Sequence, residues 1–238
     1  MKKNILIIGA SGNVGYEVSK IFYDKKFNLG LHYASNSKNL KKLSYNDSKI
    51  VYLKSKLNSE NDCKKLVKNF VKKFKTIDIV IFCGTKIIWK KWNKLNFNDF
   101  IDAFKINCIQ SFFIAKESLK KMKSGSKLIF LSSIAAKYFG SEKTFHYAIA
   151  KSALETMALG LGKKFLYKKI NVNIIRPGFI EGKLQKKGRS IKEIKERIAQ
   201  IPFKRAVKTE EVANLINYLC DDQAKNITGE IFTVGAGD

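Results

Sequence analysis

The sequence predicts an α/β fold of the Rossmann type, a doubly wound, parallel seven-stranded sheet with helices on both faces. Three observations lead to this prediction. Short apolar runs alternate with longer amphipathic segments throughout the 238 residues, a glycine-rich turn follows the first apolar run, and 45% of the residues are hydrophobic. Repeated strand–helix units form parallel sheets, and this apolar content can fill one core. We expect a single domain over residues 1–238.

The apolar runs and amphipathic segments place the individual elements. Residues 181–200 are rich in Lys, lack strand character and lie between Pro177 and Pro202, so we expect a mobile lid over a site there. The predicted strands lie near 3–8, 28–34, 49–54, 77–82, 126–132, 170–176 and 230–234. The predicted helices span 12–26, 39–45, 60–74, 98–123, 143–168 and 210–220.

The net charge of +26 raises nucleic acid as a partner, but only four of the 46 basic residues are Arg. Because base and phosphate recognition relies on Arg, we expect no nucleic-acid partner and interpret the charge as a solvated, Lys-rich surface. The functional alternative is that the positive field attracts an acidic protein or a phosphorylated substrate.

Membrane, metal and disulfide signals are weak. No apolar stretch approaches the ~20 residues of a membrane span, so we expect no membrane partner. The four cysteines lie far apart, without a CxxC pair, which predicts reduced, mostly buried thiols, no metal site and a cytoplasmic protein.

The turn after the first strand has the glycine spacing GxxGxxG. Glycines let the backbone turn tightly and approach a pyrophosphate at the N-terminus of the next helix. We therefore expect a dinucleotide here rather than a purely structural turn. The predicted contacts are Gly9, Ser11, Gly12, Asn13, Val14 and Gly15.

The end of the second strand bears on the choice of cofactor. An acidic residue that would bind a ribose 2′-hydroxyl is absent there, and Ser35, Asn36 and Lys38 could bind a 2′-phosphate instead. This favours NADP over NAD. The alternative is that these are ordinary loop residues.

Tyr147 and Lys151 are four residues apart and share one face of a predicted helix. A nearby cation favours phenolate, so Lys151 would tune Tyr147 toward neutral pH for proton transfer. Ser133 ends a buried strand and could donate a hydrogen bond to a substrate oxygen, or could cap a turn. Asn107 is a polar residue among apolar neighbours, which alone is more typical of a core amide.

Taken together, these residues resemble the classical short-chain dehydrogenase/reductase family over essentially the whole chain. The matching features are the turn at 9–15, Asn107, Ser133, the Tyr147–Lys151 pair and the segment 176–181. The chain is most similar to the 3-oxoacyl-acyl-carrier-protein reductase branch, through residues 177–181, Arg205 and residues 227–230.

The resemblance implies specific roles. Tyr147 would be the general acid, Lys151 would lower its pKa and hold the nicotinamide ribose, Ser133 would orient the carbonyl oxygen, and Asn107 would bind a water that links Lys151 to solvent. It also implies a homotetramer or homodimer in which the Tyr147 helix and its predecessor pack across a two-fold axis. Further cofactor contacts are expected at Leu57, Gly84, Pro177, Gly178 and Ile180.

The chain departs from the family pattern at four places. Asn13 replaces a glycine of the usual turn, residues 82–85 read Phe-Cys-Gly-Thr instead of Asn-Asn-Ala-Gly, Lys56 stands where an Asp near adenine is usual, and Gly182 replaces a cofactor-contacting Thr. None of these touches the four predicted catalytic residues, so we expect a specialised member of the family.

Three functions remain open. The first is an NADP-dependent reductase of a 3-oxoacyl thioester or a similar oxo substrate, presented on an acidic carrier protein. The second is an oxidoreductase of a sugar or nucleotide-sugar in surface-polysaccharide biosynthesis. The third is a non-catalytic, cofactor-binding sensor on the same fold, which predicts loss of catalytic residues that are all present in this chain.

Overall fold

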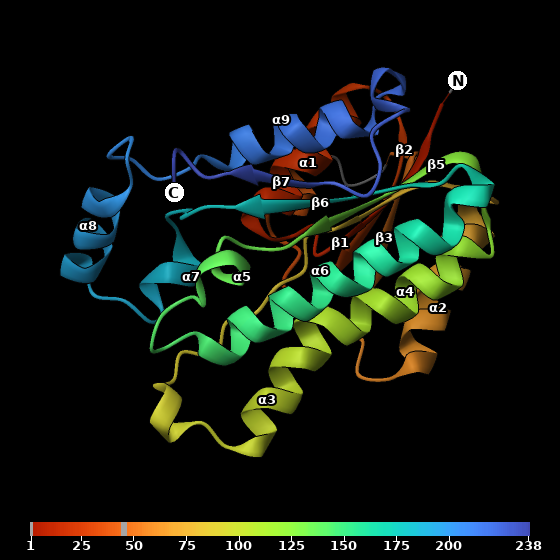
Figure 1. Cartoon of the computed structure of the whole chain (residues 1–238). Helices are drawn as coiled ribbons and strands as arrows, with labels where there is room; N and C mark the ends of the chain where they lie inside the picture. Colours follow the sequence, from red (N-terminus) through yellow and green to blue (C-terminus); the bar gives the residue numbers. More distant parts are fainter. Residues whose placement is uncertain (1, 44–46) are drawn as a thin grey trace.

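The computed structural model describes residues 2–43 and 47–238, and it has seven parallel strands in one sheet (Figure 1). The strand order is β3-β2-β1-β4-β5-β6-β7, so the chain winds outward in both directions from β1 and β4. This is the predicted doubly wound fold. The strands are β1 (Asn4–Ile8), β2 (Asn28–Tyr33), β3 (Ile50–Lys54), β4 (Ile77–Phe82), β5 (Met122–Leu131), β6 (Asn171–Pro177) and β7 (Ile231–Val234).

Helices cover both faces of the sheet (Figure 1). One face carries α1 (Asn13–Asp24) and α9 (Thr209–Cys220), and the other carries α2 (Glu60–Phe74), α4 (Gln110–Leu119) and α6 (Phe145–Phe165). The remaining helical segments are α3 (Phe97–Phe104), α5 (Ala135–Tyr138), α7 (Lys183–Lys186), α8 (Ile191–Gln200), the 3-10 turns η1 (Leu40–Lys42), η2 (Trp92–Lys94), η4 (Leu166–Lys168) and η5 (Asp222–Ala224), and the π-helical turn η3 (Lys105–Ile109).

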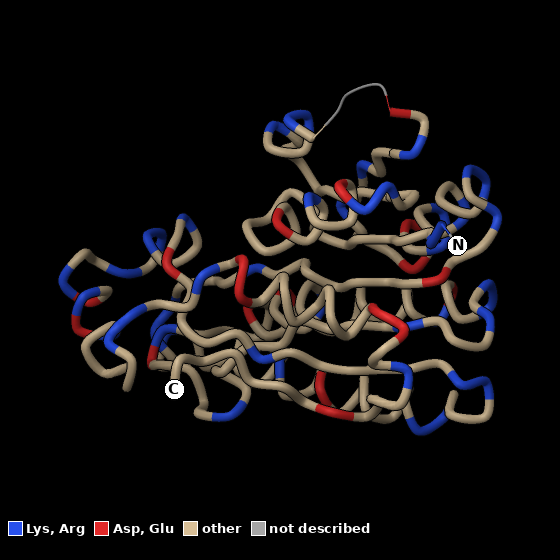
Figure 2. The backbone as a smooth tube through the Cα atoms, turned by 90° about the horizontal axis from the view of Figure 1, so that it is seen from above, with Lys and Arg blue, Asp and Glu red and all other residues tan. Residues whose placement is uncertain are grey.

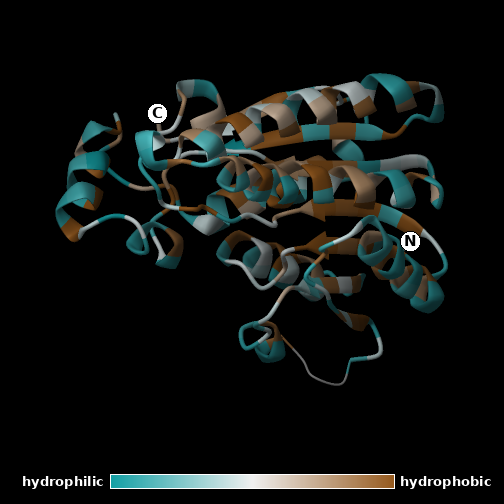
Figure 3. Ribbon diagram, turned by 90° about the horizontal axis from the view of Figure 1, so that it is seen from below, coloured by the Kyte–Doolittle hydropathy of each residue, from teal (hydrophilic) through white to brown (hydrophobic). Residues whose placement is uncertain are grey.

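Successive side chains of a strand point to opposite faces of the sheet, so each face has its own apolar core. On β1, Leu6 and Ile8 pack into one apolar cluster, whereas Ile5 and Ile7 pack into the other. The hydrophobic residues accordingly lie along the central strands, and hydrophilic residues gather on the outer helices and loops (Figure 3). Because both faces are buried, the strands read in sequence as nearly continuous apolar runs.

The helix predicted over 98–123 is helical from Phe97 to Leu119, but it consists of α3, the π-helical turn and α4. Its predicted end is too late, because β5 begins at Met122, ahead of the predicted start near 126. The π-helical turn contains Asn107, whose Nδ2 donates to the carbonyls of Ala103 and Lys86, each at 3.0 Å. A side chain that bonds into the helix and to a distant loop at once explains the interruption.

Two further segments differ from the prediction in detail. Of the helix predicted over 39–45, residues 39–43 contain only the 3-10 turn η1, and residues 44 and 45 lie outside the described residues. Residues 181–200 contain α7 and α8. The second of these begins with a capping box in which Ser190 Oγ accepts from the backbone N–H of Glu193 and the Glu193 carboxylate accepts from that of Ser190.

The four cysteines, Cys63, Cys83, Cys108 and Cys220, are buried and unpaired. Burial raises the pKa of Cys83 and Cys220 to about 12, so these two are thiols at neutral pH. Lys and Arg lie around the whole periphery (Figure 2). Within the described ranges, no helix has the length and apolarity to cross a bilayer, and no three His, Cys, Asp or Glu side chains gather as a metal site.

Candidate active site

The turn between β1 and α1 lies against the segment that follows β4, where the strand order reverses. Gly9 has φ of 75°, and a Cβ built on it would lie 2.5 Å from Cα of Gly84. Because neither Gly9 nor Gly84 has a Cβ, the backbone of the turn after β1 can approach that of the segment after β4 closely. This is the crevice at the carboxyl ends of the strands where open α/β sheets bind ligands.

The N-terminus of α1 fits an anionic group. Its N-cap residue is Gly12, which provides no side-chain cap, and Gly12 and Asn13 are exposed while Ser11 and Val14 are half-buried. The first-turn N–H groups of a helix lack intrahelical acceptors, and the helix dipole is positive there. These features match the pyrophosphate of a dinucleotide. A groove beside this terminus joins Asn13 to Ile180.

A residue that the sequence did not single out holds this turn in place. His32, which is buried near the end of β2, accepts a hydrogen bond from the Gly9 N–H at Nδ1 (3.1 Å), and its Nε2 lies 3.0 Å from the Ser55 carbonyl. Burial lowers the pKa of His32 to about 4. The ring is therefore neutral, with its proton on Nε2, and ties the glycine turn to the loop after β3.

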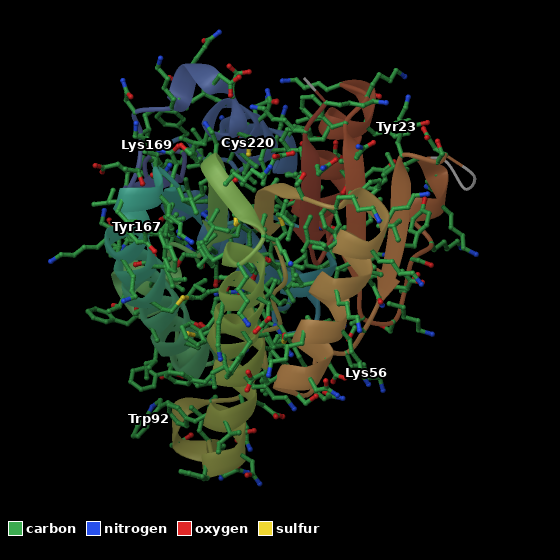
Figure 4. All side chains as sticks on the ribbon, turned by 90° about the vertical axis from the view of Figure 1, so that its right-hand side faces the viewer. Tyr23, Lys56, Trp92, Tyr167, Lys169 and Cys220 are labelled. Carbon is green, nitrogen blue, oxygen red and sulfur yellow. The ribbon has the colours of Figure 1, made fainter. Side chains whose placement is uncertain are left out.

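The residues predicted to bind the adenosine half lie at the neighbouring strand ends. Ser35, Asn36 and Lys38 are exposed in the loop after β2, where Asn36 Oδ1 accepts from the Lys38 N–H at 2.8 Å. Leu57 is buried in the core, and its carbonyl accepts from Gln110 Nε2 at 2.9 Å. The neighbouring Lys56 is exposed after β3 (Figure 4).

Tyr147 and Lys151 lie on the first turns of α6, with exposed fractions of 7% and 1%. The Tyr147 hydroxyl lies within hydrogen-bonding reach of the hydroxyls of Ser133 and Thr85. Ser133 follows β5, and Thr85 follows β4. The structure thus brings together two of the predicted catalytic residues, Ser133 and Tyr147. It adds Thr85, one of the positions where the chain departs from the family pattern, so the expectation that no departure touches the catalytic residues is wrong.

The pKa of Tyr147 is raised, because burial outweighs the hydrogen bonds with Thr85 and Ser133. This direction is opposite to the sequence-based expectation. The reason is that the Lys151 ammonium donates to the Leu131 carbonyl at 2.7 Å and lies 5.9 Å from the centre of the Tyr147 ring. Burial also lowers the pKa of Lys151 to about 8.

All hydrogen-bonding positions of the Asn107 amide are used. Its Oδ1 accepts from Thr85 Oγ1 at 2.9 Å and from the Lys86 N–H at 3.2 Å, while its Nδ2 makes the two bonds described above. An amide has two acceptor and two donor positions. A water bound by Asn107 would therefore have to use its main chain.

The segment after β6 is held from both sides. The Pro177 carbonyl accepts from the Ile134 N–H at 2.9 Å, and the Gly178 N–H donates to the Val234 carbonyl at 2.8 Å. A Cβ on Gly178 would lie 2.8 Å from Cα of Gly235. Of the three predicted contacts here, Ile180 lines the groove that also contains Asn13 of the glycine turn.

The predicted lid lies beyond the carboxyl ends of the strands (Figure 1). Trp89, in the loop after β4, donates from Nε1 to the Leu184 carbonyl at 3.1 Å. Lys143 binds Glu193 at 2.7 Å. The lid is therefore tied to the loop after β4 and to the segment that leads into α6. Sequence reasoning missed Trp89, because only the fold places it against the lid.

Comparison with known proteins gives matches over nearly the whole chain. The family model described as enoyl-(acyl carrier protein) reductase matches residues 9–237. The 3-oxoacyl-[acyl-carrier-protein] reductase FabG of Rickettsia felis is 30% identical over 243 residues, covering 99% of this chain and 96% of that protein. Glucose and ribitol dehydrogenase homolog 2 of Arabidopsis thaliana is 29% identical over 193 residues, covering 79% of this chain and 65% of that protein.

Solved structures agree with these matches. A short-chain dehydrogenase/reductase from Brucella melitensis, described as a glucose/ribitol dehydrogenase, has a TM-score of 0.90 and 26% identity and covers 100% of this chain and 98% of its own. A dehydrogenase from Burkholderia cenocepacia with bound NADP has a TM-score of 0.89 and 18% identity, with coverages of 99% and 93%. The chain therefore belongs to the short-chain dehydrogenase/reductase family of oxidoreductases, as its sequence predicted.

Proposed function

We propose that this protein is an NADP-dependent reductase that converts the carbonyl of a small oxo substrate, foremost a 3-oxoacyl thioester, to an alcohol. The observation that carries the proposal is the buried Tyr147 hydroxyl between Ser133 and Thr85, at the end of the sheet where the glycine turn fits a dinucleotide. A proton donor next to a site for a hydride carrier is the arrangement that carbonyl reduction requires.

The raised pKa of Tyr147 keeps the phenol in the state that carbonyl reduction needs. A phenol whose pKa lies above its ordinary value is protonated at neutral pH, so Tyr147 would act as the acid that protonates the carbonyl oxygen. Ser133 would donate a hydrogen bond to the same oxygen as negative charge develops on it. When bound, the nicotinamide supplies the hydride.

Lys151 and Asn107 would assist Tyr147 without contacting the substrate carbonyl. The Lys151 ammonium, held by the Leu131 carbonyl, would stabilise the tyrosinate that remains after proton transfer. Asn107 would hold Thr85 and the backbone of Lys86 in place below the Tyr147 hydroxyl. Both would therefore support the proton transfer without contacting the carbonyl carbon.

NADP is favoured because the loop after β2 has hydroxyl, amide and ammonium groups and no carboxylate to bind a ribose 2′-hydroxyl. Ser35, Asn36 and Lys38 are exposed at this position and can contact a 2′-phosphate. The test is a titration of NADPH against NADH by fluorescence, with Lys38→Met as the variant. Tighter binding of NADPH that weakens in Lys38→Met supports the choice, whereas tighter NADH binding refutes it.

For the substrate, the FabG name of the Rickettsia relative favours a 3-oxoacyl thioester, and the net charge of +26 would attract an acidic carrier protein. The dehydrogenase names of the Arabidopsis and Brucella proteins favour the alternative of a sugar substrate. NADPH oxidation with 3-oxoacyl thioesters, simple ketones and oxo-sugars decides between them. A protein that binds NADPH but reduces none of these compounds would instead be the cofactor-binding sensor.

We also propose self-association through α4 and α6, as the family resemblance implies. The exposed positions in the middle of α6 are Ser152, Thr156 and Gly160, which recur every fourth residue and form a narrow strip of small side chains. Ile109 and Phe112 are exposed on the neighbouring helix, at 43% and 37%. A flat strip beside exposed apolar side chains suits a two-fold helix–helix contact.

A reductase that draws on NADPH is further proposed to work in the cytoplasm.

A further inference from the structure

Arg189 lies in the lid, between α7 and α8, with its guanidinium held between two aromatic rings. Its central carbon is 5.5 Å from the ring centre of Trp89 and 5.9 Å from that of Phe179. Trp89 is itself held by its bond to the Leu184 carbonyl, and Phe179 is buried. Stacking of this kind fixes the plane of a guanidinium and leaves its edge free to donate hydrogen bonds.

Among the described residues, Arg189 has no ion-pair partner. Glu193, whose carboxylate is bound to Lys143, attracts the guanidinium only from beyond ion-pair distance. The chain has four arginines, and Arg176, Arg197 and Arg205 pair with Glu155, Asp238 and Glu211, respectively. In residues 2–43 and 47–238, Arg189 forms no ion pair, and its Nε is buried with no hydrogen-bond partner. Burial and the nearby Arg197 lower its pKa. A partly desolvated cation without a partner is unfavourable unless something else satisfies it.

The contacts of Arg189 place it beside the candidate active site. Trp89 is four residues beyond Thr85, and Phe179 precedes Ile180, which lines the groove beside the glycine turn. Lys143, four residues before Tyr147, donates to the carbonyl of Gly188 at 3.4 Å. The guanidinium thus contacts the loops that follow β4 and β6, and both loops begin at the candidate active site.

A second polar atom of the lid is also buried without a partner. It is the Oε1 atom of Gln185, one turn before Arg189. Buried polar atoms are normally paired, so unpaired ones on two residues of the lid are expected where a ligand completes the bonding. By contrast, the lid cation Lys187 is exposed.

We propose that Arg189 is the specificity residue for an anionic group on the substrate, a carboxylate or a phosphate ester. The inference rests on the proposed carbonyl reduction at Tyr147 and adds to it the chemical class of the substrate. The free edge of the guanidinium would bind two oxygens of the anion side by side. Gln185 would bind a neighbouring hydroxyl or amide of the same molecule. The carbonyl of this substrate would then face Tyr147 while its charged end lies under the lid.

The first test measures binding without turnover. In a Trp92→Phe background, where Trp89 is the remaining tryptophan, we would titrate acetoacetate and inorganic phosphate and follow Trp89 fluorescence. We expect a saturable change with at least one anion, a loss of affinity of about tenfold or more in Arg189→Met, and no loss in Lys187→Met. Identical titrations for Arg189→Met and the parent protein, or no saturable change with either anion, would overturn the inference.

The second test uses matched substrates. NADPH oxidation would be compared for acetoacetate and its methyl ester, and for dihydroxyacetone phosphate and dihydroxyacetone, so that each pair differs by one anionic group. We expect Arg189→Met to raise KM about tenfold or more for the preferred anion and to leave the neutral partner unchanged. The pair that responds identifies carboxylate or phosphate. Arg189→Lys, which keeps the charge but not the planar fork, should recover part of the affinity if Arg189→Met folds poorly.

The outcomes separate the two proposals. Equal loss with charged and neutral partners would mean that Arg189 only supports the lid, which overturns the inference and leaves carbonyl reduction intact. Anion binding that depends on Arg189, without reduction of any compound, would uphold the subsite and count against the proposed function.

Discussion

The hydroxyl of Thr85 donates a hydrogen bond of 2.9 Å to Oδ1 of Asn107. Since a hydroxyl has one proton, this bond leaves the Thr85 oxygen as an acceptor toward the Tyr147 hydroxyl. Thr85 therefore connects the interrupted helix around Asn107 to the proposed proton donor. A glycine, which the family pattern has at this position, could not make this connection.

We predict that Thr85→Val lowers kcat roughly tenfold, the effect of losing about one hydrogen bond from the oriented Tyr147. Thr85→Ser keeps the hydroxyl and should retain most of the activity. Steady-state NADPH oxidation checks both variants, and NADPH affinity should be the same in both because the cofactor turn is untouched. Equal activity of the valine and serine variants would mean that Thr85 has no part in positioning Tyr147.

His32 is expected to make the free energy of unfolding depend on pH. Its pKa is about 4 in the folded protein and 6.5 in the unfolded chain, so the unfolded chain binds more protons between these values. Stability from this group is fully present above pH 6.5 and is lost as pH falls toward 4, by up to about 3 kcal/mol. His32→Asn, which keeps an acceptor for the Gly9 N–H, should flatten this fall in urea unfolding experiments.

The control for this prediction is His146, the other histidine of the chain, whose pKa is also lowered by burial. Replacing His146 as well should flatten the fall further above about pH 5. Below that, the remaining slope comes from carboxylates such as Glu193 and Glu211, whose pKa values ion pairs and hydrogen bonds lower to about 2. An unchanged slope in His32→Asn would show that the His32 ring does not stay neutral in the folded protein.

The ion pair between Glu155 and Arg176 joins α6 to β6. Two bonds of 2.7 and 2.5 Å link the nearly buried carboxylate to the guanidinium. We predict that Glu155→Gln lowers the free energy of unfolding by about 3 kcal/mol, because it leaves a partly buried cation without its counterion. Glu60→Gln breaks exposed pairs with Lys64 and Lys116 and should have little effect. Similar urea midpoints for the two variants would contradict this prediction.

Gly160 tests the proposed dimer without disturbing the fold of the subunit. A Cβ at this position meets no atom within 4 Å, although the residue lies inside α6. Gly160→Ala should therefore keep the dimer and gain roughly 0.5–1 kcal/mol of helix stability. Gly160→Lys places a long charged side chain on the strip and should give monomers in analytical ultracentrifugation. A dimer that tolerates the lysine would place the contact elsewhere.

Much of the fold could be predicted from the sequence because its strands are buried on both faces and appear as continuous apolar runs. The interruption around Asn107 could not, since it depends on bonds to Lys86 and Thr85, about twenty residues away. Ser133 and Tyr147 were each predicted as catalytic residues from the family pattern. The direction in which the pKa of Tyr147 is shifted was not predicted correctly. It depends on where the Lys151 ammonium points, and the Leu131 carbonyl that holds this ammonium lies twenty residues earlier in the chain.

The measurement that tests the account most directly compares wild type with Tyr147→Phe in NADPH oxidation with 3-oxoacyl thioesters and simple ketones, with NADPH affinity determined in parallel. Removal of one hydroxyl leaves the ring in its buried position and removes only the proposed proton donor. We predict unchanged NADPH affinity and a kcat reduced at least about a hundredfold, within the range that general acid catalysis contributes. Equal turnover by the two proteins would contradict the assignment of Tyr147 as the acid.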